Sequence, residues 1–458
     1  SAFTAYFMDS YSVVIDSEMI RNSLQTSFKE SVDLFSFRLV LYVVFLAIIP
    51  SYIVYKTKIN YKSLKGEIVS KLKTITLSLV IIFIIIFSFS KFYTSFFREH
   101  KPLRYNINPI YWIYSIGNYV HKTLDTAPSE IKDIGLDSKV VEEENEPKEL
   151  IILVVGETAR ADRFSLNGYS KETNPLLKKE DLVSFTNMSS CGTSTAHSVP
   201  CMFSIFPKDD YSYKKGASTK NVLDVLNNTQ DVAILWRDNN SDSKGVALRV
   251  DYEDFQTPKT NSICDEECRD EGMLVGLEDY IEKNRGRDIL IVLHQMGNHG
   301  PAYYKRYPKE FEKFTPVCKT NQLENCTKEE ISNAYDNAIL YTDYFLSKAI
   351  NFLKKYSKTH EAGLLYVSDH GESLGENGIY LHGMPYAIAP KAQTHVASLI
   401  WLDDGQMAHE YDINKIKQNK DKEYSHDNLF DTLLGLFEVK TEVYKKELDI
   451  LNEARKED

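Results

Sequence analysis

Two short apolar runs, at residues 150–156 and 363–368, each lead into residue types that commonly bind metals. Continuous aliphatic runs of this length, bounded by glycine, are typical of strands buried on both faces of a parallel sheet. The first run is followed by Glu157, and the second by Asp369 and His370. Because functional residues gather at the carboxyl ends of the strands in an open α/β sheet, the sequence predicts a metal site assembled from separate strands.

Three further apolar runs, at 232–236, 288–293 and 397–402, alternate with amphipathic stretches, of which 329–356 is the clearest. Strands that alternate with helices in this way predict an α/β architecture with a mainly parallel central sheet. No glycine loop of the nucleotide-binding kind is visible in the sequence.

The N-terminal part contains two segments, at about 36–55 and 74–91, that are apolar enough to cross a membrane. Each supplies about 17 to 20 residues, the lower end of what spans a hydrocarbon core. A pair of buried core helices is the alternative interpretation. The loop between them, 56–73, contains one acidic residue, Glu67, and six lysines: Lys56, Lys58, Lys62, Lys65, Lys71 and Lys73. Short lysine-rich loops stay in the cytoplasm, so both ends of this hairpin are predicted on the far side of the membrane.

Two segments separate the hairpin from the α/β part of the chain. Residues 92–119 are crowded with aromatic and basic side chains, which suits a membrane–water interface, although buried core aromatics would give the same pattern. Residues 126–149 are acidic and poor in large apolar groups, which predicts a linker. We therefore expect a membrane and interfacial helical region over 1–125 and a second domain over 150–458.

The cysteines indicate the compartment of the second domain. They form three close pairs, Cys191/Cys201, Cys264/Cys268 and Cys318/Cys326. An even number with local pairing fits disulfides in an oxidising compartment, although six cysteines permit other pairings. The alternative, a zinc site of thiolates, would show repeated Cys-x-x-Cys, which is absent from the sequence.

Charge and the start of the chain add two expectations. The net charge of −11 leaves no basic surplus to neutralise phosphates, so we expect no nucleic-acid partner. The chain begins at Ser1 without an initiator Met and without a signal-peptide pattern, so we expect a processed chain or a fragment.

Several histidines also lie after the predicted strands. Each alone is better explained as a core histidine, but their grouping is harder to dismiss: His294, His299, His370 and His382. Mixed carboxylate and imidazole ligands favour Zn²⁺ over Mg²⁺ or Ca²⁺, with Mn²⁺ left open.

The segment 191–201, Cys-Gly-Thr-Ser-Thr-Ala-His-Ser-Val-Pro-Cys, offers a candidate nucleophile. Hydroxyl residues precede an apolar stretch, as at a helix N-terminus, where backbone N–H groups favour an alkoxide or a bound phosphate. A threonine hydroxyl is a poor nucleophile unless a metal deprotonates it. An ordinary helix cap is the alternative.

These motifs carry a family resemblance over nearly the whole chain. Gly-Glu-Thr-Ala-Arg-Ala-Asp at 156–162, Ser-Cys-Gly-Thr-Ser-Thr at 190–195 and Ser-Asp-His-Gly-Glu-Ser-Leu-Gly-Glu-Asn at 368–377, with the runs 236–245 and 294–301, closely resemble the phosphoethanolamine transferases. That family acts on lipid A, includes the mobile colistin-resistance enzymes and belongs to the alkaline phosphatase and sulfatase superfamily. The resemblance implies an alkaline phosphatase-like sandwich preceded by a helical transmembrane region.

The resemblance also implies roles for individual residues. Thr195 matches the nucleophile that becomes phosphoethanolaminated. Glu157, Asp369 and His370 match the ligands of the main zinc ion, and Thr195 completes that ligand set. Positions for a second metal or the substrate phosphate match His299 and His382, whereas His294 has no assigned role and remains a supporting or structural candidate. Residues around the phosphoethanolamine group match Asn240, Ser241 and Lys244.

One group gains a role only through the resemblance. Asn22, Thr26 and Glu30 recur every four residues and would line one face of a helix, which by spacing alone is a solvated face. In the family, the matching residues belong to a helix that helps to form the lipid-substrate pocket.

The function implied is transfer of phosphoethanolamine from phosphatidylethanolamine to an envelope acceptor, most commonly lipid A in this family. The reaction would proceed through a covalent intermediate on Thr195, with one tight zinc site and a second left open. The expected location is the bacterial inner membrane, with the catalytic domain in the periplasm. Two alternatives remain: a metal-dependent phosphodiesterase or sulfatase, and a non-catalytic membrane-anchored binding protein. Family members usually have more membrane helices than the two seen here, so we expect the others to precede Ser1.

Overall fold

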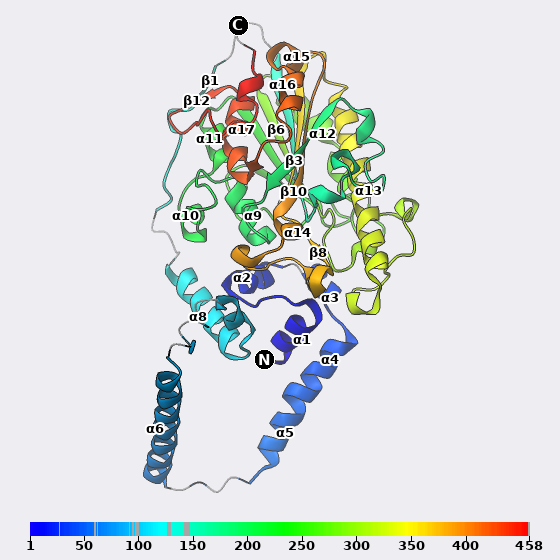
Figure 1. Cartoon of the computed structure of the whole chain (residues 1–458). Coiled ribbons are helices and arrows are strands. Elements are labelled where there is room, and N and C mark those ends of the chain that lie inside the picture. Colours follow the sequence, from blue (N-terminus) through cyan, green and yellow to red (C-terminus); the bar gives the residue numbers. More distant parts are fainter. Residues whose placement is uncertain are drawn as a thin grey trace.

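In the computed structural model, an α/β domain lies above a helical region that ends in a long helical hairpin (Figure 1). The structure describes residues 1–26, 28–58, 61, 63–90, 92–93, 96, 100–125, 130–141 and 147–456, and for residues 28–30, 101–102 and 124–125 it describes the backbone alone.

An eight-stranded mixed sheet forms the centre of the α/β domain. From edge to edge it runs β11 (Tyr424–Ser425), β3 (Leu182–Ser189), β10 (His395–Leu402), β7 (His360–Ser368), β2 (Lys148–Gly156), β6 (Asp288–His294), β4 (Val232–Asp238) and β5 (Asp251–Asp254). Only β10 is antiparallel to its neighbours in this sheet. The five apolar runs thus form β2, β4, β6, β7 and β10, and the expectation of a mainly parallel sheet is confirmed.

Helices cover both faces of the sheet. On β2, Leu150, Ile152 and Val154 pack into one core with α13 (Lys328–Leu353), whereas Ile151 and Leu153 face a second core. The second core includes α9 (Thr195–Met202), α11 (Val222–Asn228) and α17 (Leu429–Leu436). Alternate side chains of one strand therefore serve opposite layers, as the predicted sandwich requires.

Shorter elements complete this domain. The other helices are α10 (Tyr213–Ala217), α12 (Leu277–Lys283), α14 (Lys391–Thr394), α15 (Met407–Glu410) and α16 (Ile413–Gln418). Two small antiparallel sheets pair β1 (Lys139–Val140) with β12 (Val439–Lys440), and β8 (Ser373–Leu374) with β9 (Tyr380–Leu381).

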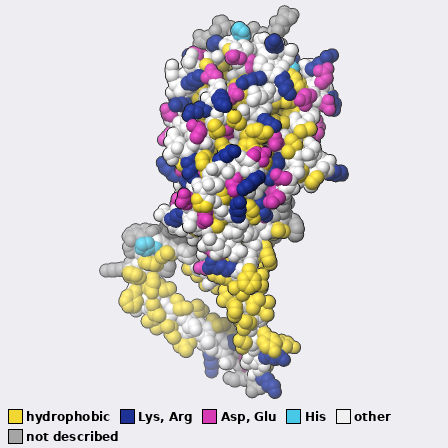
Figure 2. All heavy atoms as spheres, turned by 90° about the vertical axis from the view of Figure 1, so that its right-hand side faces the viewer, with side chains coloured by type: hydrophobic (Ala, Val, Ile, Leu, Met, Phe, Trp, Pro, Cys, Tyr) yellow, Lys and Arg dark blue, Asp and Glu magenta, His cyan; other side chains and the backbone are white. Residues whose placement is uncertain are grey.

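The helical region begins with α1 (Ala2–Tyr11), α2 (Ser17–Gln25) and α3 (Phe28–Asp33). One continuous helix, Phe37–Lys56, then joins α4 (Phe37–Val43) to α5 (Ile49–Lys56) through a π-helical turn, and α6 (Leu64–Ser88) follows. By length and composition these two helices could cross a membrane, and they are 6% and 0% buried, unlike core helices. Figure 2 shows hydrophobic side chains over this hairpin, whereas charged side chains are scattered over the α/β domain. The next α-helix described after the hairpin, α8 (Ile110–Asp125), packs against α2.

The structure differs from the sequence-based expectations at two places. The lysine-rich loop expected over 56–73 is partly helical, because α6 begins at Leu64, where the Ser63 hydroxyl accepts a hydrogen bond from the Gly66 N–H; Lys62 lies outside the described residues. The expected linker, 126–149, is not free of the domain: β1 pairs with β12, and the Ile134 side chain is buried in the second core. Backbone pairing with an open edge anchors this segment despite its polar composition. Residues 126–129 and 142–146 lie outside the described residues.

Candidate active site

Four side chains from three segments meet at the carboxyl end of the sheet. Glu157 follows β2, Asp369 and His370 follow the neighbouring parallel strand β7, and Thr195 is the first residue of α9. The Thr195 hydroxyl lies 3.0 Å from Glu157 Oε2 and 3.3 Å from His370 Nε2. His370 Nε2 is also 3.4 Å from Glu157 Oε1 and from Asp369 Oδ2.

The chemistry of this group fits a divalent cation. Glu157 Oε1 and Asp369 Oδ2 are buried and have no hydrogen-bond partner among the described residues. Burial, with the Asp369 carboxylate beside it, raises the pKa of Glu157, and burial raises the pKa of Asp369. His370 Nδ1 lies 3.0 Å from the Gly371 carbonyl, which leaves Nε2 as an electron-pair donor toward the group, and burial lowers the pKa of this imidazole. A cation among these atoms would satisfy both orphaned oxygens and offset the repulsion between the carboxylates.

A hydrogen-bonded chain supports Glu157 from one side. The Asn240 amide donates to Glu157 Oε2 over 2.8 Å, and the Ser241 hydroxyl donates to Asn240 Oδ1 over 2.8 Å. Lys244 Nζ donates to the Ser241 hydroxyl over 2.7 Å and to the Gln25 carbonyl, at the end of α2, over 3.2 Å. The structure therefore brings Asn240, Ser241 and Lys244 together and extends their network to the helical region.

His299 and His382 lie beside the four-residue group. The ring centroids of His370 and His382 are 4.4 Å apart, and those of His299 and His382 are 5.6 Å apart. His382 Nδ1 is 2.9 Å from Glu372 Oε2, and the Tyr303 hydroxyl donates to Glu372 Oε1 over 2.9 Å. Glu372 lies two residues after His370 in the same motif, but no pattern in the sequence marks it as a site residue. A carboxylate on Nδ1 fixes the tautomer and the orientation of the His382 ring.

His294 lies apart from the candidate ligands, in a buried pair of its own. Its Nδ1 is 2.9 Å from Asp238 Oδ2, which also accepts the indole N–H of Trp236 over 2.9 Å. Burial opposes ionisation of Asp238, but its contacts with His294, the Trp236 indole N–H and the Asp242 backbone N–H together hold the pKa of that carboxyl below its usual range. The pair joins the ends of β4 and β6.

A cavity of about 380 Å³ opens between the helical region and the site. Asn22 of α2 and Thr26, which caps its C-terminus, line it together with His299 and His382. Its remaining walls are mainly apolar, including Phe7, Ile15, Leu34 and Leu39. Glu30 lies in α3, but its side chain is outside the described residues. The cavity is apolar along the helices and ends at two imidazoles.

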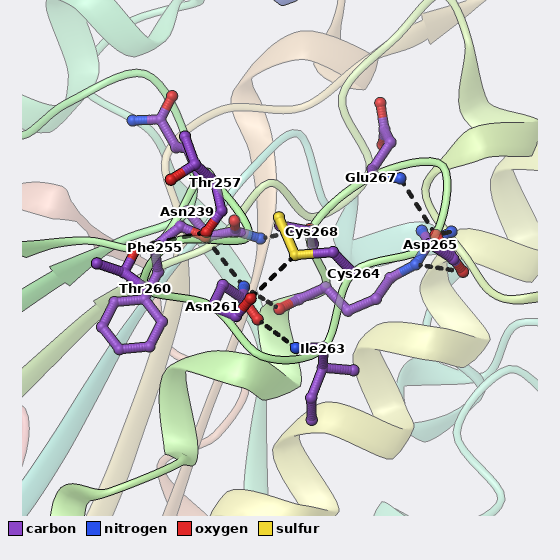
Figure 3. Close-up of a disulfide and its surroundings, with 12 residues drawn as sticks. Asn239, Phe255, Thr257, Thr260, Asn261, Ile263, Cys264, Asp265, Glu267 and Cys268 are labelled. Atoms are coloured by element: carbon purple, nitrogen blue, oxygen red, sulfur yellow. Dashed lines mark hydrogen bonds and ion pairs between the residues drawn. A yellow bond between two sulfur atoms is a disulfide. The ribbon is translucent and has the colours of Figure 1, made fainter.

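Three disulfides join the cysteines in the local pairs that the spacing suggested: Cys191–Cys201, Cys264–Cys268 and Cys318–Cys326. The first spans the segment that contains Thr195. The second closes a short loop near the end of β4 (Figure 3), where the Asn239 amide donates to the Cys268 carbonyl over 3.0 Å.

Comparison with known proteins agrees with this architecture. Residues 1–124 match the family described as phosphoethanolamine transferase EptA/EptB, and residues 149–439 match the sulfatase family. The chain is 46% identical over 449 residues to phosphatidylethanolamine transferase Mcr-2 of Escherichia coli, covering 96% of this chain and 82% of that protein. It is 42% identical over 462 residues to phosphoethanolamine transferase EptA of Escherichia coli (strain K12), covering 99% and 84%.

A solved structure extends the match to the helices. The integral membrane lipooligosaccharide phosphoethanolamine transferase A (EptA) of Neisseria meningitidis superposes with a TM-score of 0.94 at 36% identity, covering 100% of this chain and 85% of that one. The chain therefore belongs to the phosphoethanolamine transferase family of the alkaline phosphatase and sulfatase superfamily, and it is a transferase enzyme.

Proposed function

We propose that this enzyme transfers phosphoethanolamine from phosphatidylethanolamine to the lipid A part of an envelope lipid, through an intermediate on Thr195. The donor appears in the name of the Mcr-2 relative, and a lipooligosaccharide acceptor in the name of the Neisseria meningitidis structure. The observation that carries the proposal is the position of Thr195, whose hydroxyl touches Glu157 and His370 while the neighbouring His382 lines the cavity.

Glu157, Thr195, Asp369 and His370 would hold a zinc ion, and His299 with His382 would hold the substrate phosphate or a second metal. When bound, zinc would lower the pKa of the Thr195 hydroxyl and withdraw charge from the phosphoryl oxygens.

In the first step, Thr195 Oγ1 forms a bond to phosphorus while the bond to the diacylglycerol oxygen breaks. The Thr195 hydroxyl lies against Glu157 and His370, which would hold the zinc, so its proton would leave to water when the zinc lowers its pKa. In the second step, an acceptor oxygen forms a bond to phosphorus while the bond to Thr195 Oγ1 breaks, and His299 and His382 are the candidates to take the acceptor proton. Lys244 contributes positive charge on the Asn240 side of the site.

The same proposal assigns a location. The apolar hairpin would lie in the bacterial inner membrane, and residues 150–458 would form a periplasmic catalytic domain, where the disulfides persist. The cavity between the two regions would then admit the acyl chains of the donor from the membrane side.

The first step is tested by incubating the full chain with phosphatidylethanolamine and measuring its intact mass. We expect one phosphoethanolamine adduct, which disappears in Thr195→Ala and after treatment with a chelator. Thr193→Ala is the matched control, because the Thr193 hydroxyl donates to the Met384 carbonyl instead of Glu157 and its loss should leave the adduct. No adduct in the wild type with zinc present would refute the proposal. Free phosphoethanolamine without modified lipid A would instead indicate a hydrolase.

A further inference from the structure

Arg306 is a buried cation whose guanidinium bonds to three separate segments. Its side chain is 1% exposed. Nη2 donates to Asp33 Oδ2 over 2.9 Å, Nη1 donates to Glu267, and Nε donates to the backbone carbonyl of His299 over 2.7 Å. These partners come from the end of α3, from the loop closed by Cys264–Cys268, and from the loop after β6.

Asp33, at the end of α3, adds a second carboxylate to the surroundings of Arg306. Lys305 also pairs with Asp33, so two cations face the two carboxylates of Asp33 and Glu267. Removing one partner from a buried ion pair is strongly destabilising, so the Asp33 contact ties Arg306 to the end of α3. Asp33 is the only one of these four residues that belongs to the helical region, so α3 supplies one of the two carboxylates that Arg306 contacts.

The segment that leads to His299 is held at a second point, just beyond the loop closed by Cys264–Cys268. Figure 3 shows Glu267 on this loop, with its side chain directed away from the sulfur atoms. Asp270, just beyond the loop, accepts the backbone N–H groups of Met296 over 2.9 Å and Gly297 over 3.1 Å. The segment 296–299 is therefore held at its start by Asp270 and at its end by Arg306.

We propose that Arg306 is a positioning residue that couples the docking of α3 to the placement of His299. The inference rests on the proposed role of His299 at the substrate phosphate. Asp33 ends the helix that follows the cavity-lining face of α2, and His299 lines the same cavity. The Arg306 guanidinium thus fixes the position of the helical cavity wall, which would contact the lipid, relative to the His299 imidazole, which would contact the lipid's phosphate. Arginine suits this task because its planar fork holds three acceptors in fixed directions, which a lysine does not.

The test uses the full chain in detergent, with kcat and KM measured for transfer from phosphatidylethanolamine. Arg306→Lys keeps the charge but loses the fork, and we expect kcat to fall about tenfold, as small misplacements of active-site groups cause. In a His299→Ala background the same substitution should change kcat by less than about twofold, because residues that act as a unit are not additive. Asp33→Asn tests the coupling from the helical side and should lower kcat in the same His299-dependent way.

Two controls separate positioning from stability. Arg455→Lys alters a half-buried pair with Glu438 away from His299, and Asp9→Asn alters an exposed pair with Arg38 within the helical region. Both should leave kcat unchanged. The proposal is overturned if Arg306→Lys and Asp33→Asn lower kcat equally with and without His299, or retain kcat while only the thermal midpoint falls. Absence of transfer by the wild type would instead count against the proposed function.

Discussion

His426 connects two parts of the candidate site that are distant in the sequence. Its Nδ1 accepts the backbone N–H of Cys191 over 3.1 Å, and its Nε2 donates to the Ser368 carbonyl over 2.9 Å. The first contact holds the segment before Thr195, and the second holds the end of β7 directly before Asp369. Only the neutral ring with its proton on Nε2 makes both bonds, and burial lowers the pKa of His426 to about 4.

This pKa predicts a loss of stability in acid. The folded value lies below the ordinary value of about 6.5, so the unfolded chain binds a proton that the folded chain excludes. The contribution of neutral His426 is complete above pH 6.5 and is lost as the pH falls toward 4, by about 3 kcal/mol. Thermal unfolding in detergent between pH 7.5 and 4.5 should show a smaller decline for His426→Gln than for the wild type. His409→Gln, at an exposed position, should follow the wild type; equal declines in all three proteins would contradict the assignment.

At the scale of elements, α9 presents the nucleophile from its first turn. Thr195 begins the helix, and the preceding Ser194 makes no side-chain cap. The free N–H groups and the positive end of the helix dipole therefore lie beside the hydroxyl that is proposed to become negatively charged. The Cys191–Cys201 disulfide spans this turn, so the chain cannot unwind there without straining the closed loop.

Two disulfides of similar loop length separate stability from geometry. Opening Cys191–Cys201 with paired Cys→Ser substitutions should cost about 3 kcal/mol by loop-closure entropy. Opening Cys318–Cys326, whose separation of 8 residues is close to the 10 of the first, should cost a similar amount. We expect kcat to fall strongly only in the first variant, because only that loop carries Thr195. Comparable kcat losses at matched thermal midpoints would show that both bridges act through stability alone.

Sequence patterns predict the strands in which every side chain along the strand is apolar and buried. The runs that became β2, β6 and β7 are aliphatic on both faces, and their ends gave Glu157, Asp369 and His370. In contrast, β5 is wholly exposed and exists only through pairing with β4, so no hydrophobic pattern marks it. Glu372 and Arg306 were missed because their roles depend on tertiary contacts: Arg306 meets Asp33 across 273 residues of sequence.

At the scale of the whole molecule, the catalytic edge of the sheet faces the helical region. In Figure 1, α2 lies below α9, and the two helices are in contact. Polar links cross this boundary next to the site: Lys244 to Gln25, Arg306 to Asp33, and His197 of α9 to Glu18 over 3.6 Å. An enzyme whose donor is a membrane lipid needs its nucleophile at this boundary, because the headgroup stays near the membrane surface while the acyl chains remain in the bilayer.

The charge asymmetry of the hairpin predicts its orientation. All six cysteines are in disulfides, so an engineered cysteine would be the one reactive thiol. Lys65 lies in the first turn of α6, within the lysine-rich segment 56–73, and Lys446 lies in the catalytic domain. Both side chains are exposed, so Lys65→Cys and Lys446→Cys form a matched pair. In intact spheroplasts, a membrane-impermeant maleimide should label only the second variant, and detergent should make both reactive. Labelling of Lys65→Cys before lysis would place the lysines outside the cytoplasm, against the positive-inside rule. It would also mean that the catalytic domain and the hairpin turn lie on the same side, which a hairpin crossing the membrane twice does not allow.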